Sequence, residues 1–172
     1  MNTNIHILKV KILEDCPNKE FVTNYYQNIV NKIPHRGDCG VDIIFPQDMN
    51  FITNTVTKCN MGIACEFIPS NTTESGPFMM VSRSSIVNTP LTLANSVGIF
   101  DPEYRGPVIA ALRCNIDRRH SSTIEKFEYQ SKMGERLVQI ISPDMKPIQV
   151  VLVDYLTETT RGANGFGSTN NK

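Results

Sequence analysis

The residues best suited to chemistry lie in the stretch Asn95–Leu112, around one acid and one tyrosine. Asp101 precedes Pro102, which lacks an N–H group and has a fixed φ, and a residue before proline favours an extended backbone. We therefore expect the Asp101 carboxylate to be held rigidly. Tyr104 offers an aromatic face that can stack on a sugar or a base, and Gly106 allows a backbone or a ligand to approach closely. The alternative is an ordinary turn with a surface aspartate and a half-buried tyrosine.

Two further stretches carry polar groups that could bind phosphate or support a cation. Arg83, Ser84 and Ser85 follow a short apolar run. A guanidinium fork with hydroxyls and backbone donors forms a plausible phosphate cradle, and a solvated turn is the alternative. Asp42 lies within a strand pattern, where aspartate is disfavoured, so its carboxylate is a candidate functional group.

The C-terminal stretch 158–172 is rich in glycine and cannot fold alone. One interpretation is a disordered end, which is common at chain termini. The other is an arm that closes over a polyphosphate through its backbone N–H groups, Arg161, Ser168 and Thr169, while Phe166 stacks on a base.

Elements that position these groups are predicted to be mostly β-strands, because apolar residues alternate with polar ones between turn signals. Apolar runs flank Asp101 on both sides, which predicts a β-hairpin with the aspartate at its turn. The other strands are expected near residues 8–12, 42–45, 51–67 (broken at Asn54, Asn60 and Gly62), 78–81, 115–132 (a solvated loop and edge strand), 137–141 and 149–155. One amphipathic helix is expected at about 18–31, with Pro17 in its first turn. This pattern indicates an all-β sandwich or jelly roll.

Length and composition favour one domain with a core of its own. The chain has 172 residues and no net charge, with 17 basic and 17 acidic side chains, so double-stranded nucleic acid is not an expected partner. Its five cysteines form no metal-ligand spacing and no disulfide framework. Since no signal peptide or long apolar run is present, we expect an intracellular protein, cytoplasmic or nuclear, that is not secreted and has no membrane partner.

Five separated stretches, in order along the chain, resemble the five motifs of the trimeric dUTPase family. They are Gly37–Asp42, Ser82–Ser85, Gly98–Gly106, Gly134–Gln139 and Arg161–Thr169. The resemblance covers nearly the whole chain and implies a jelly-roll-like β-barrel over residues 1–157, with the helix as an insertion and 158–172 as an arm that closes over the site. It also implies a homotrimer with shared active sites. The implied reaction is the Mg²⁺-dependent hydrolysis of dUTP to dUMP and pyrophosphate, which limits uracil incorporation into DNA and supplies dUMP for dTMP synthesis.

The same resemblance implies a role for each matching residue. Asp101 would hold and deprotonate the water that attacks the α-phosphorus, and Tyr104 would stack on the deoxyribose and exclude a 2′-hydroxyl. Asp42 would act on the triphosphate-bound Mg²⁺ through water. The other implied substrate contacts are Asn95, Gly98, Ile99 and Phe100 for uracil, Arg83, Ser84, Ser85 and Gln139 for the phosphates, and Arg161, Phe166, Gly167, Ser168 and Thr169 in an arm that reaches another chain's site.

Departures from the family pattern leave two alternatives open. Ser82 and Ser85 replace the usual Pro and Gly of the second motif, and Arg-Ser-Ser also occurs in the related dCTP deaminases. A dCTP deaminase, or a bifunctional deaminase and dUTPase, is therefore one alternative. Deaminases use a glutamate five positions beyond the glycine that here is Gly106, and this position is Ala111, which cannot act as an acid or base. The other alternative is a non-catalytic nucleotide-binding protein, although that function would not require the Asp101 carboxylate.

The fifth motif also departs from the pattern, because Ala163 and Asn164 stand where the family usually has Glu and Gly, and Asn170 stands where a glycine is common.

Overall fold

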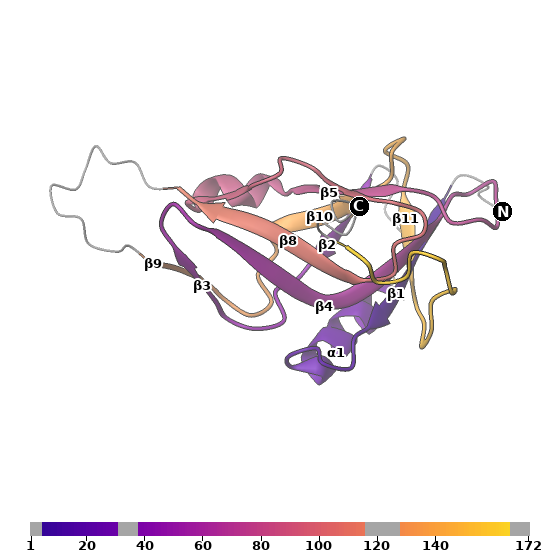
Figure 1. Cartoon of the computed structure of the whole chain (residues 1–172), viewed down its shortest axis with the longest axis horizontal. Coiled ribbons are helices and arrows are strands. Elements are labelled where there is room, and N and C mark those ends of the chain that lie inside the picture. The colour runs from indigo at the N-terminus through magenta and orange to yellow at the C-terminus, as the bar shows by residue number, and fades with distance from the viewer. Residues whose placement is uncertain (1–4, 31–37, 116–127, 166–172) are drawn as a thin grey trace, which may run out of the picture.

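The computed structural model describes residues 5–30, 38–115 and 128–165. The elements of this part, in chain order, are β1 (His6–Ile12), α1 (Lys19–Val30), β2 (Gly40–Ile43), β3 (Met49–Ile52), β4 (Val56–Ile68), β5 (Phe78–Ser82), the 3-10 helix η1 (Ser84–Asn88), β6 (Leu91–Leu93), β7 (Gly98–Phe100), β8 (Pro107–Cys114), β9 (Glu128–Ser131), β10 (Val138–Ile141) and β11 (Ile148–Leu152). Figure 1 shows β3 and β9 at one end of the long axis of the molecule. The predicted predominance of strands is confirmed.

Two larger sheets supply the hydrophobic core. One has the strand order β11-β1-β4-β8-β6 and the other has the order β2-β10-β5-β7, while β3 and β9 form a separate pair. Buried residues of both large sheets, such as Leu8 in β1 and Ile140 in β10, belong to one hydrophobic cluster. The all-β, jelly-roll-like fold is thus confirmed, and the sheets are open rather than closed into a complete barrel.

Strand β4 is longer than the sequence pattern predicts. A turn at Asn54, whose φ is +59°, separates it from β3, as expected. The expected interruption at Asn60 and Gly62 is wrong, because the strand continues and only its register with β8 shifts there. Gly62 has a φ of +73°, and a Cβ at this position would lie 2.3 Å from Cys16 Sγ. The register shift at Asn60 and Gly62 is a β-bulge, which bends a strand without ending it.

The predicted hairpin around Asp101 is also wrong. Strand β7 pairs with β5, whereas β8 pairs with β4 and β6 in the other large sheet. The turn that contains Asp101 therefore carries the chain from one sheet to the other. The ring of Phe100 stacks on Phe78 with centroids 4.5 Å apart, and this contact joins β7 to β5. Alternating apolar residues suit either pairing, so the local pattern could not distinguish them.

Helix α1 lies within the predicted range and packs against β11 and β1. It begins at Lys19, after Asn18, whose φ is +49°, so Pro17 precedes the helix rather than occupying its first turn. The predicted amphipathic pattern is confirmed by Val22 and Tyr26, which are fully buried, whereas the side chain of Phe21 is exposed.

Neighbouring tyrosines of α1 provide a matched test of stability. The Tyr26 hydroxyl is buried and has no hydrogen-bond partner within the described ranges. The Tyr25 hydroxyl donates to the Asp42 carbonyl oxygen at 3.2 Å. Burial, reinforced by the Asp42 charge, raises the pKa of Tyr25 to about 12 and keeps it a donor at neutral pH.

We expect Tyr26→Phe to raise the free energy of unfolding by about 1 kcal/mol, because it removes an unpaired buried hydroxyl. Tyr25→Phe should lower it by about 1 kcal/mol, because it removes a hydrogen bond and leaves the Asp42 carbonyl with one donor fewer. Urea unfolding of both variants measures the two changes. A loss of stability in Tyr26→Phe would contradict the assignment of an unpaired hydroxyl.

Candidate active site

The turn after β7 presents Asp101 to solvent on a fixed backbone. The Tyr104 N–H donates to the Asp101 carbonyl at 3.1 Å, which closes a four-residue turn with Pro102 at its second position. The Arg105 guanidinium donates through Nη1 to the carbonyl oxygens of Pro102 and Tyr104, at 2.6 and 3.1 Å. The side chain of Asp101 is 53% exposed. A carboxylate in this setting is available to a ligand while its main chain is held in place.

Tyr104 is fixed beside this carboxylate. Its hydroxyl donates to the Pro107 carbonyl at 2.9 Å, and the residue is only 8% exposed. A Cβ at Gly106 would lie 2.5 Å from the Tyr104 hydroxyl oxygen. A close neighbour was predicted at Gly106. That neighbour is the ring of Tyr104 in the same chain. Burial raises the pKa of Tyr104, although Arg161 opposes the shift, so the phenol is a stable donor at neutral pH.

The first part of the C-terminal arm brings Arg161 to this turn. Arg161 Nη1 forms an ion pair with Asp101 Oδ2, and the guanidinium carbon lies 5.7 Å from the centroid of the Tyr104 ring. Within the single chain, Arg161 lies against that chain's own aspartate, and the expected reach of the arm into another chain's site stays a prediction. The other predicted arm residues, Phe166, Gly167, Ser168 and Thr169, lie outside the described residues.

A pocket gathers most of the residues predicted for uracil, sugar and water. We refer to it as the Asp101 pocket. It is lined by Asn95, Gly98, Ile99, Phe100, Asp101, Tyr104, Pro107, Ile109, Arg161 and Gly165. The side chain of Phe100 is largely buried in the core, so the backbone of β7 is the part of this residue best placed to contact a ligand.

A second pocket gathers most of the residues predicted for phosphate. We refer to it as the Arg83 pocket. It is lined by Asp38, Cys39, Gly40, Asp42, Arg83, Ser84 and Gln139. Asp42 Oδ1 lies 2.5 Å from Arg83 Nε, and its Oδ2 lies 3.2 Å from Arg136 Nη1. The carboxylate thus holds two guanidinium groups at one position, and guanidinium groups suit a phosphate.

Ser85 and Gln139 support this second pocket from two sides. The Ser85 hydroxyl donates to the Arg136 carbonyl at 3.0 Å, and Arg83 Nη1 donates to the same oxygen at 2.9 Å. Ser85 lines an adjoining hollow that shares Arg83 with the Arg83 pocket. The Gln139 side chain occupies space that a Cβ at Gly40 would fill, since its Oε1 would then be only 2.3 Å away. Gly40 therefore makes room for the Gln139 amide.

Among the residues that the structure describes, the two pockets have no lining residue in common. Strand β2, which carries Asp42, and strand β7, which borders the Asp101 pocket, form opposite edges of the four-stranded sheet. With β10 and β5 between them, these edges are roughly 14 Å apart across the strands. One chain therefore presents the predicted residues as two separate groups.

The described part of the chain contains no group of three or more His, Cys, Asp or Glu side chains arranged to hold a metal ion. In the same part, no helix is long and apolar enough to cross a membrane.

The dUTPase family model matches residues 27–170. This chain belongs to the dUTPase family. The resemblance of the five motifs is thereby confirmed at the level of the family.

Curated dUTPases and solved dUTPase structures agree with this assignment. The deoxyuridine 5′-triphosphate nucleotidohydrolase of Picosynechococcus sp. is 30% identical over 142 residues, which cover 82% of this chain and 90% of that protein. The deoxyuridine 5′-triphosphate nucleotidohydrolase of Corynebacterium efficiens is 32% identical over 136 residues, which cover 78% of this chain and 68% of that protein. The dUTPase of Staphylococcus bacteriophage 80alpha, solved with dUPNHPP, has a TM-score of 0.54 at 21% identity and covers 94% of this chain and 96% of that one. The similarity to the bacteriophage structure supports the assignment of the fold.

Sequence reasoning missed several residues that organise the dUTPase motifs. Arg136 was not among the predicted site residues, although it contacts Asp42 and lies in the fourth motif. Arg105 lies in the third motif and was given no role, yet it holds the turn of Asp101. Glu66 is 2% exposed and pairs with Arg105. The available signal was a single charge inside the apolar run of β4, where a buried acid requires a partner.

Proposed function

We propose that this dUTPase hydrolyses dUTP to dUMP and pyrophosphate, with Asp101 as the general base. The observation that carries the proposal is the turn of Asp101, which presents an exposed carboxylate on a fixed backbone inside a pocket that also contains Tyr104 and the edge of β7. A general base must be held within hydrogen-bond reach of the water that it deprotonates, and this turn supplies that constraint.

In the proposed reaction, Asp101 accepts a proton as a water oxygen bonds to the α-phosphorus. The bond from the α-phosphorus to the α–β bridging oxygen breaks, and pyrophosphate leaves. Arg161, which pairs with Asp101, would turn to the γ-phosphate when dUTP binds. A phosphate carries more charge than a carboxylate and offers three oxygens to the guanidinium fork, so this exchange is favourable.

Selectivity would come from the same pocket. The Tyr104 ring would stack on the deoxyribose and leave no room for a 2′-hydroxyl, because its own position is fixed by Pro107 and Gly106. Asn95 and the backbone of Gly98, Ile99 and Phe100 would hydrogen-bond the uracil edge, with Phe166 over its face. Among the described residues, β7 is an edge strand that pairs with β5, which supports such base contacts.

The Arg83 pocket would bind the triphosphate through Arg83, Ser84, Ser85 and Gln139, and Gly167, Ser168 and Thr169 of the arm would add further donors. Asp42 fits a Mg²⁺ ion carried by the substrate. A carboxylate beside a phosphate site suits magnesium, which usually keeps several waters and takes most other ligands from phosphates. The ion would neutralise charge on the triphosphate, and Asp42 would hold its waters by hydrogen bonds.

We further propose a homotrimer in which each site joins the Asp101 pocket of one chain to the Arg83 pocket of another. The separation of the two pockets on opposite sheet edges supports this arrangement. The exposure of Val87 (80%), just after the second motif, and of Ile99 (72%), within the third, also supports contact with a further chain. In a closed assembly with rotational symmetry, every copy would contribute the same two surfaces.

The function is tested by incubating the protein with Mg²⁺ and separately with dUTP, dCTP, dTTP and UTP, while pyrophosphate and ammonia are measured. We expect pyrophosphate from dUTP alone and no product when the metal is chelated. Ammonia from dCTP would support the deaminase alternative. Another residue would then have to replace the glutamate that deaminases use, because this chain has the buried Ala111 at that position. No product from any nucleotide would support the non-catalytic alternative.

A further inference from the structure

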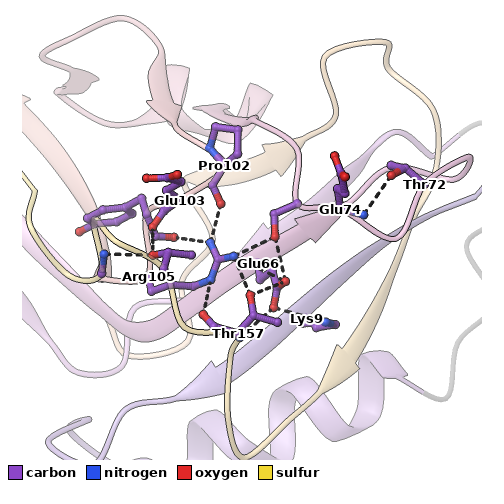
Figure 2. A network of polar contacts seen from close by, with 12 residues as sticks. Lys9, Glu66, Thr72, Glu74, Pro102, Glu103, Arg105 and Thr157 are labelled. Carbon is purple, nitrogen blue, oxygen red and sulfur yellow. Dashed lines mark hydrogen bonds and ion pairs between the residues drawn. The ribbon is translucent and has the colours of Figure 1, made fainter.

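A buried polar network lies beneath the turn of Asp101, centred on Glu66 and Arg105 (Figure 2). The side chains of these two residues are 2% and 9% exposed, and Arg105 Nη2 lies 3.5 Å from Glu66 Oε1. The Ser75 hydroxyl joins them, because it donates to Glu66 Oε1 and accepts from Arg105 Nη2, at 2.9 and 2.8 Å. Lys9 Nζ lies 3.3 Å from the other carboxylate oxygen of Glu66. The acid is therefore fully partnered.

The guanidinium of Arg105 faces the turn and the arm at once. Nη1 donates to the carbonyls of Pro102 and Tyr104. Nε donates to the Thr157 carbonyl at 3.0 Å, and Nη2 donates to the Thr157 hydroxyl at 2.9 Å. A planar fork with five N–H groups can satisfy these acceptors together, whereas the ammonium group of a lysine cannot.

Thr157 fixes the start of the arm to the same acid. Its N–H donates to Glu66 Oε2 at 3.3 Å, and its hydroxyl donates to Glu66 Oε1 at 2.9 Å. These bonds and those from Ser75 and Lys9 outweigh the effect of burial and hold the pKa of Glu66 below its usual value, so it is ionised at neutral pH.

Two backbone contacts continue the connection toward Arg161. The Thr159 hydroxyl donates to the Glu103 carbonyl at 2.5 Å, and the Arg105 N–H donates to the Gly162 carbonyl at 2.8 Å. The arm is therefore attached to the turn at Thr159 and again at Gly162. Arg161 lies between these attachments, and this explains how it meets Asp101 of its own chain.

We infer that Glu66, Arg105 and Thr157 are positioning residues that set the arm and the Asp101 turn relative to each other. The inference rests on the proposed function for its effect on turnover, but not for its effect on the arm. Because one guanidinium contacts both segments, a shift of either segment is passed to the other. The network thus determines where Arg161 stands when the triphosphate arrives.

Thr157→Val tests this inference, because it removes the hydroxyl that joins Glu66 and Arg105 and keeps nearly the same shape. We expect faster amide hydrogen exchange in residues 157–165 and a fall of about 10-fold in kcat for dUTP with little change in KM. Thr157→Ser restores the hydroxyl and should restore both readouts. Thr72→Val is the matched control, since its hydroxyl accepts the local Glu74 N–H (Figure 2), and this variant should change neither readout.

Exchange in β10 serves as the internal reference for overall stability. Unchanged exchange in 157–165, or exchange that rises equally in β10, would overturn the inference. Faster exchange of the arm with unchanged kcat would overturn the positioning role. If the wild-type protein turns over no nucleotide, the proposed function fails, and the exchange comparison still decides whether the network holds the arm.

Discussion

Asp101→Asn is expected to lower kcat for dUTP by about 10²–10⁴-fold, the usual contribution of a general base. The variant should fold normally, because the side chain is half exposed and the asparagine carbonyl can still accept from Arg161. It should also bind a non-hydrolysable dUTP analogue nearly as well as the wild type. Steady-state kinetics and calorimetric titration measure the two properties. Retained turnover would contradict the role of Asp101, and lost binding would indicate that the carboxylate mainly orders the pocket.

Mixing two inactive variants tests whether the site joins two chains. Arg83→Ala removes the guanidinium of the other pocket and should lower kcat by about 10²–10³-fold. When Asp101→Asn and Arg83→Ala chains are co-expressed, about a quarter of the sites combine an intact Asp101 pocket with an intact Arg83 pocket. Activity should then return to a measurable fraction of the wild-type value. If both pockets of one chain formed a single site, mixing would restore nothing.

Removal of residues 161–172 is expected to have the second large effect. Ending the chain at Thr160 keeps the contacts of Thr157 and Thr159 but removes Arg161. We expect kcat/KM to fall by about 100-fold or more, because a guanidinium that stabilises a transferring phosphoryl group contributes on this scale. The free energy of unfolding should fall by no more than about 2 kcal/mol, since few hydrogen bonds are lost.

The full-length variant Arg161→Ala is the control for this truncation. An equal loss in both proteins would assign the effect to the guanidinium. A much smaller loss in Arg161→Ala would assign it to residues 162–172. A truncated protein with wild-type kcat/KM would exclude any catalytic need for the arm, and an unfolded one would contradict the expected small change in stability.

The turn around Asp101 and several regular elements were predictable from local sequence. Asp101, Pro102 and Tyr104 define a turn by residue type alone, because proline restricts the backbone on both sides of its peptide bond. The alternation of Leu8 and Val10 with lysines correctly predicted β1, and the apolar stripe of α1 correctly predicted a helix. These features depend on neighbours in the chain, which the sequence states directly.

Only the tertiary structure decided which strands pair and which charges meet. Strands β7 and β8 join different sheets, and the glycine at position 62 bends β4 instead of ending it, because pairing depends on packing between distant residues such as Phe78 and Phe100. The partnership of Glu66 with Arg105 is likewise invisible in sequence. A buried charge requires a partner, but the sequence does not say from which segment that partner comes.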